Sequence, residues 1–77
     1  MSDSGKYIVV FKDHVSDADV EKYAADVGAN GGEVGNRFGS LLKGFSATIP
    51  TSYLNQLQSL QGGIIDYIEP DQVVKTQ

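Results

Sequence analysis

The chain has 77 residues, a net charge of −4 and no cysteine, which excludes a disulfide framework, a cysteine nucleophile and a cysteine-based metal site. Its six Lys and Arg residues are scattered, so no basic stripe is available for binding nucleic acid. No segment is long and apolar enough to span a membrane, and the polar residues after Met1 do not resemble a signal peptide. We therefore expect one small cytoplasmic domain over residues 1–77.

The first part of the chain predicts a strand followed by a helix. Residues 6–12 are mostly β-branched and aromatic, which is typical of a strand. Ser16 then has the position of a helix N-cap, with Val15 and Val20 placed to form a hydrophobic staple around it. Apolar residues recur every three or four positions after this cap, so we expect an amphipathic helix that ends in the glycine-rich segment 28–32.

The middle of the chain predicts two strands joined by a short turn. The first strand covers residues 33–38, with Val34 and Phe38 expected on one face. The second lies within residues 41–49, where apolar and polar residues alternate from position 45 onward. Such alternation indicates one buried and one polar face.

The last third of the chain predicts a second helix. Either Thr51 or Ser52 can cap its start, and Gly62 with Gly63 is expected to end it. Its apolar stripe consists of Leu54, Leu57 and Leu60.

A fourth strand over residues 64–69 completes the order βαββαβ. Strict alternation places Ile65 and Tyr67 together on the face opposite to Ile68. The order is typical of the α+β ferredoxin-like sandwich, in which two helices cover one face of a four-stranded antiparallel sheet. Because the strands carry apolar residues on both faces, we expect apolar area on the face without helices. That area indicates either a docking surface or ordinary surface apolar residues.

No titratable residue belongs to a catalytic or metal-binding pattern. His14 is the single histidine, and the sequence places no partner for it. Acidic residues gather between positions 13 and 21, where helix capping and the helix dipole explain them. Arg37, the only arginine, lies in a predicted strand and not in a glycine-rich phosphate loop. We expect no enzyme activity, no metal and no cofactor.

Three segments resemble a known family in the right order and spacing, namely residues 6–12, 43–50 and 66–74. They resemble the propeptides of subtilisin-like serine proteases and the small stand-alone inhibitors related to them, inhibitor family I9. The chain is most similar to the fungal stand-alone inhibitors, and the likeness covers almost its whole length. The resemblance implies a protein that is monomeric when free and inhibits a subtilisin-like serine protease as a 1:1 complex, with no nucleic acid or membrane partner.

The resemblance also implies a mechanism. The open sheet face packs on two surface helices of the protease, and Glu69 and Asp71 lie at the N-termini of these helices. The extended tail, residues 70–77, enters the active-site cleft as an added strand and stays there like a reaction product. Its binding residues are Val73, Val74, Lys75, Thr76 and Gln77.

Within the tail, Val74 would occupy an apolar outer pocket and Gln77 would lie next to the catalytic serine. Gln77 departs from the large apolar or aromatic residue that subtilisins favour at this place.

Two alternatives stay open at this point. One is a propeptide that acts as an intramolecular chaperone for a protease, which a coding sequence continuing past Gln77 would favour. The other is a non-inhibitory interaction module that uses the open sheet face for an unrelated partner, which failure to slow any subtilisin-like enzyme would favour.

Overall fold

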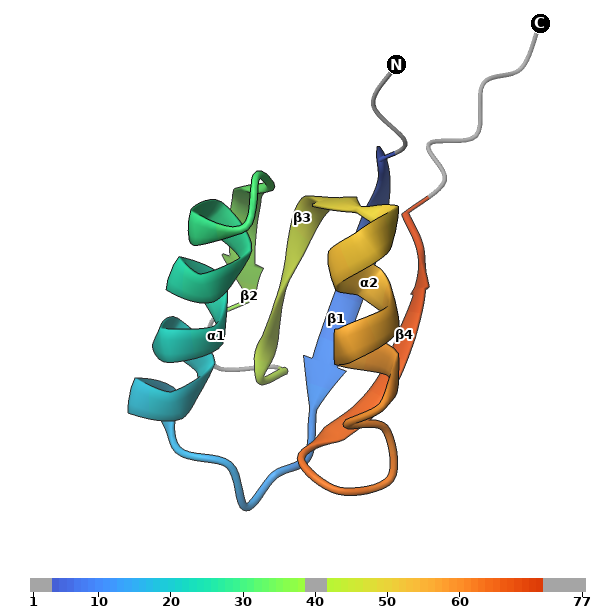
Figure 1. Cartoon of the computed structure of the whole chain (residues 1–77). Helices are drawn as coiled ribbons and strands as arrows, with labels where there is room; N and C mark the ends of the chain where they lie inside the picture. The colour runs from blue at the N-terminus through green and yellow to red at the C-terminus, as the bar shows by residue number, and fades with distance from the viewer. Residues whose placement is uncertain (1–3, 39–41, 72–77) are drawn as a thin grey trace, which may run out of the picture.

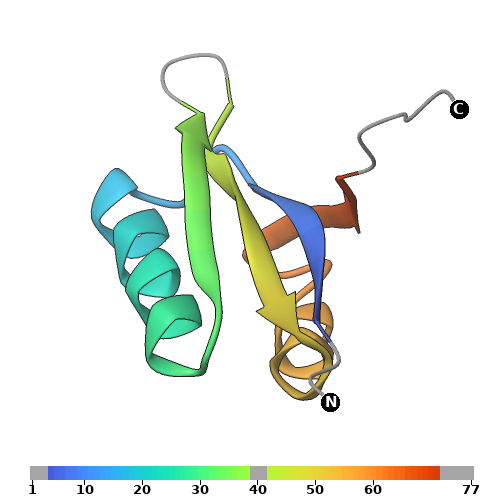
Figure 2. The same cartoon turned by 90° about the horizontal axis from the view of Figure 1, so that it is seen from above.

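The computed structural model describes residues 4–38 and 42–71. Its elements are β1 (Ser4–Phe11), α1 (Asp17–Ala29), β2 (Glu33–Phe38), β3 (Gly44–Pro50), α2 (Thr51–Gln58) and β4 (Ile65–Pro70). The strands form one antiparallel sheet in the order β2-β3-β1-β4. Both helices lie on the same side of this sheet (Figures 1 and 2). The predicted ferredoxin-like α+β fold is confirmed.

Helix α1 begins and ends close to the predicted positions. The Ser16 hydroxyl accepts a hydrogen bond from the Asp19 backbone N–H at 3.1 Å, as an N-cap does. Val15 and Val20 on either side of this cap are both buried. The helix ends at Ala29, and Gly31 follows with a φ of 92°, a conformation that glycine adopts without steric cost.

Helix α2 differs from the prediction at both ends. Pro50 occupies the N-cap position and makes no side-chain capping bond. The predicted cap at Thr51 or Ser52 is wrong because both residues are already helical. The helix ends at Gln58, before the two glycines, and the Ser59 hydroxyl donates to a carbonyl of the last turn at 2.6 Å.

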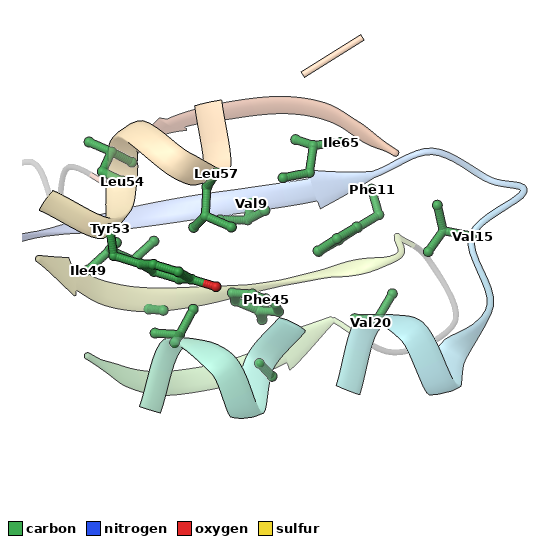
Figure 3. Packing of buried hydrophobic residues seen from close by; sticks show 13 residues of the cluster. Val9, Phe11, Val15, Val20, Phe45, Ile49, Tyr53, Leu54, Leu57 and Ile65 are labelled. Atoms are coloured by element: carbon green, nitrogen blue, oxygen red, sulfur yellow. The ribbon is translucent and has the colours of Figure 1, made fainter. Parts of the chain in front are cut away.

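A single hydrophobic core fills the space between the sheet and the helices (Figure 3). Within this core, the Phe11 ring lies 5.8 Å from the Phe45 ring and 5.7 Å from the Tyr23 ring, measured between centroids. Burying one Val, Leu, Ile or Phe side chain contributes about 1.5–3 kcal/mol. The side chains that are less than 2% exposed are Val9, Phe11, Val27, Phe45, Ile49, Leu57 and Ile65.

A β-bulge in β4 breaks the strict alternation. Asp66 has no partner on β1 between the paired residues Ile65 and Tyr67. Ile65 and Ile68 therefore both pack on the core, whereas Tyr67 lies on the opposite face. The prediction that Ile65 and Tyr67 share a face is wrong, because one extra residue reverses the alternation.

A second bulge has the same effect in β2. Gly35 has no partner between the residues Val34 and Asn36, which pair with consecutive residues of β3. Val34 packs against the core, and the register beyond the bulge places Phe38 on the opposite face. The prediction that Val34 and Phe38 share a face is therefore also wrong.

Candidate functional site

The sheet has one face that no helix of the described residues covers, and we call it the open face. Its side chains alternate along each strand with those of the core. They are Lys6, Ile8 and Val10 of β1, Asn36 and Phe38 of β2, Ser46 and Thr48 of β3, and Tyr67 and Glu69 of β4. This face is the candidate functional site because none of its side chains belongs to the core cluster between the sheet and the helices.

One end of the open face is apolar. Val10 of β1 pairs there with Tyr67 of β4. Val10 is 3% exposed, but Tyr67 is 39% exposed and is not part of the core cluster. Among the described residues, Leu42 is the other large apolar side chain with such exposure, at 45%, but it lies before β3 and outside the strands that form the open face.

The other end of the open face is polar and contains a hollow. Its lining includes one basic and two acidic side chains together with neutral polar groups. These residues are Lys6, Glu33, Asn36, Ser46, Thr48 and Asp71. The polarity of the open face thus changes along the strands, from an aromatic end to a charged end.

The two predicted binding acids lie on the open face. Glu69 is exposed and pairs with Ile8, whose side chain is on that face. Asp71 follows two residues later, is half-buried and lines the hollow. Because successive side chains on one face of a strand are about 7 Å apart, the two carboxylates are neighbours. Their role in binding stays a prediction.

The last described residue, Asp71, lies at the polar end of the open face. The Asp71 backbone N–H donates to the Lys6 carbonyl oxygen at 2.9 Å, so the pairing of β4 with β1 continues just past Pro70. In Figure 1 this end of β4 lies next to the start of β1. The predicted tail residues Val73, Val74, Lys75, Thr76 and Gln77 lie outside the described residues.

Charged residues near the β2–β3 hairpin have structural partners. Arg37 Nε lies 2.7 Å from Glu21 Oε2, and Lys43 Nζ lies 3.2 Å from Asp17 Oδ1. Both pairs tie the hairpin to α1, and such solvent-exposed pairs contribute about 0–1 kcal/mol each. Sequence reasoning did not find them because neither pair is close in sequence.

The described residues contain no cluster of three or more His, Cys, Asp or Glu side chains that could hold a metal ion. His14 is exposed in the turn before α1. Neither helix in this part of the chain is long and apolar enough to cross a membrane, and the cytoplasmic location stays a prediction.

Tyr67, like Phe38, is a residue of this surface whose face sequence reasoning predicted wrongly. A signal for its true position was present, because Ile65 and Ile68 are three residues apart. Two core residues at that spacing cannot both face inward in a regular strand. The spacing therefore indicates a bulge between them.

Comparison with known proteins identifies relatives over nearly the full chain. The family model described as Peptidase inhibitor I9 matches residues 6–77. Serine proteinase inhibitor IA-2 of Pleurotus ostreatus is 40% identical over 75 residues, which cover 96% of this chain and 99% of that protein. Serine proteinase inhibitor IA-1 of the same fungus is 39% identical over 75 residues, with the same coverage. An uncharacterised protein of Schizosaccharomyces pombe is 34% identical over 70 residues, which cover 91% of this chain and 88% of that protein. The chain therefore belongs to the peptidase inhibitor I9 family, a family of peptidase inhibitors and not of enzymes.

Proposed function

We propose that this protein inhibits subtilisin-like serine endopeptidases, as a monomer that forms a 1:1 complex with the protease. Membership of the I9 family supports this function, and the two Pleurotus relatives are named as serine proteinase inhibitors. Those names favour an inhibitor over the alternatives of a folding template and an unrelated interaction module. The observation that carries the proposal is the placement of Glu69 and Asp71 side by side on the open face, directly before the tail residues that are proposed to bind the cleft.

In the proposed complex, the open face packs on two surface helices of the protease. A helix N-terminus presents free N–H groups and the positive end of the helix dipole, so it is a favourable partner for a carboxylate. The spacing of Glu69 and Asp71 supports one acid per helix. Their separation of about 7 Å along β4 is close to the 8–10 Å between the axes of packed helices, and flexible side chains cover the difference.

The tail, residues 70–77, then enters the active-site cleft as an added strand. Main-chain hydrogen bonds from Val73 to Gln77 hold it, with Val74 in an apolar outer pocket and Gln77 next to the catalytic serine. The position of Asp71 beside Lys6 supports this arrangement, because the residues proposed to bind the cleft follow Asp71 in the sequence.

Both surfaces are needed for tight inhibition. Ordering five tail residues costs about 1–2 kcal/mol per residue in backbone entropy. Association adds a further loss of translational and rotational freedom. Contacts at the open face must offset these costs, so the tail alone is expected to bind weakly.

The experiment that tests the proposal measures hydrolysis of a small chromogenic peptide by a subtilisin-like protease. The intact chain is compared with a chain truncated after Val73, and both are followed by mass spectrometry over hours. We expect the intact chain to inhibit at a 1:1 ratio and stay intact, and the truncated chain to inhibit weakly or be degraded. The proposal would be overturned if neither the intact chain nor the truncated chain slowed hydrolysis.

A further inference from the structure

The bulge at Asp66 decides which side chains of β4 reach the open face. Ile65 is fully buried in the core. Counting from it, strict alternation would turn Tyr67, Glu69 and Asp71 toward the helices. The bulge reverses the alternation and brings all three onto the open face as one stripe. β-Bulges commonly re-aim side chains next to functional sites, so the stripe has the placement expected of a binding element.

Tyr67 is the aromatic member of this stripe. Its side chain is 39% exposed and is not part of the core cluster, so the fold leaves much of its ring in water. Val10 and Ile8 of β1 lie beside it on the same face. An aromatic ring on an apolar platform gains free energy when a partner covers it, and tyrosine is enriched among the residues that carry most of the energy of an interface.

The stripe has a direction. From Tyr67 to Asp71 it spans about 13 Å, at the rise of a strand. The acids lie toward the point at which the chain leaves the sheet, and Tyr67 lies at the far end. A protease that receives the acids at its helix N-termini and the tail in its cleft therefore meets Tyr67 on the side of the helices away from the cleft.

We propose that Tyr67 is the apolar anchor of the protease complex, where it packs on an apolar patch of the protease surface beside the helix N-termini that receive Glu69 and Asp71. This inference rests on the proposed function. Charged groups mainly steer the encounter and set its orientation, whereas buried apolar contacts mainly determine how long a complex lasts. Tyr67 thus sets the lifetime of the complex, and the acids set its rate of formation.

The test uses the full chain and a subtilisin-like protease, with association and dissociation rate constants of inhibition as the readout. Tyr67→Thr removes the ring and keeps a β-branched residue in the strand. Tyr67→Phe keeps the ring and removes only the hydroxyl. Leu42→Thr is the matched control, because it removes a large apolar side chain of similar exposure outside β4.

We expect Tyr67→Thr to dissociate at least about tenfold faster than the intact chain, as loss of an interface anchor does, with its association rate changed less than about twofold. Tyr67→Phe and Leu42→Thr are expected to dissociate at nearly the original rate. Thermal unfolding of each variant checks that the chain is folded. If Tyr67→Thr does not fold, Tyr67→Val takes its place, with the same expected result.

Two results would overturn the proposal that Tyr67 is the anchor. One is a folded Tyr67→Thr variant that dissociates as slowly as the intact chain. The other is an equal acceleration by Leu42→Thr, which would mean that any lost apolar side chain has this effect. An intact chain that inhibits no subtilisin-like protease would instead contradict the proposed function itself, and the anchor with it.

Discussion

The two faces of the sheet carry side chains of different kinds, although the same four strands build both. The face toward the helices holds the core, in which residues such as Phe45, Ile49 and Ile65 are fully buried. The open face carries charged and neutral polar groups together with Tyr67, which is 39% exposed. Under the proposed function, the face toward the helices stabilises the fold and the open face binds the protease. Substitutions on one face should change the free energy of unfolding, and those on the other should change binding.

The largest expected effect comes from the core face. Phe45→Ala removes a fully buried ring that lies 5.8 Å from the Phe11 ring, and it should lower the free energy of unfolding by about 3–5 kcal/mol. A domain of this size has little stability to lose, so the variant should be degraded by a protease that the intact chain inhibits. Urea unfolding measures the loss. Thr48→Val, which keeps a β-branched side chain of similar size on the open face, is the control and should change stability by less than about 1 kcal/mol. Equal losses in both variants would contradict the separation of the faces.

A second prediction concerns Gly44, where the backbone of β3 lies close to the backbone of β1. A Cβ at Gly44 would overlap the backbone carbonyl of Val9, so Gly44→Ala should destabilise the chain by about 1–3 kcal/mol. Gly28 is the matched control, because a Cβ there has no neighbour within 4 Å. Since alanine favours a helix, Gly28→Ala in α1 should raise stability by up to about 1 kcal/mol. Thermal unfolding should show that Gly44→Ala lowers stability and that Gly28→Ala raises it. A stabilised Gly44→Ala would contradict the prediction, because it would mean that β1 moves away from β3 to admit the new methyl group.

The third prediction sharpens the role of the open face. Replacing Glu69 by Gln and Asp71 by Asn together should weaken inhibition about tenfold, since each carboxylate at a helix N-terminus contributes about 0.3–1 kcal/mol. The midpoint of thermal unfolding should stay nearly unchanged. The loss should shrink as salt is added, because salt screens exposed charges. Glu33→Gln removes an acid from β2 at the same hollow and is the control. If Glu33→Gln weakens inhibition as much, overall charge and not the β4 stripe would be responsible.

The smallest expected effect lies at the boundary of the core, at Tyr53 of α2, whose ring reaches toward α1 (Figure 3). Burial raises the pKa of Tyr53 above its ordinary value of 10.0, and the charge of Asp26 acts in the same direction. The folded chain therefore holds this proton to higher pH than the unfolded chain does. Its contribution to stability is complete below pH 10 and is lost as the pH rises through the raised pKa.

Unfolding free energies measured from pH 8 to pH 11.5 test this prediction for Tyr53. The intact chain should lose stability above about pH 10, and Tyr53→Phe should lose less over the same range. A decline of the same steepness in both proteins would assign it to other groups.

Local sequence patterns predicted most of the fold because the interactions behind them are local. The Ser16 cap joins residues three positions apart, and the leucines of α2 follow the helical repeat. The cap of α2 was predicted wrongly. Thr51 and Ser52 have side chains that can cap a helix, but they lie one and two residues after the N-cap position, which Pro50 occupies. Pro50 ends β3 and precedes the helix directly, which leaves no residue between the two elements.

The order of strands and helices and the polar and apolar faces of β3 were determined by the sequence itself. These properties depend on residue type and on spacing within one element. The face of the sheet on which Tyr67, Glu69 and Asp71 lie was decided only by the tertiary structure. A bulge arises from how β4 pairs with β1, a strand more than fifty residues earlier in the sequence, and burying both Ile65 and Ile68 requires one unpaired residue between them. The stripe on the open face is thus a consequence of how the core packs on the other side.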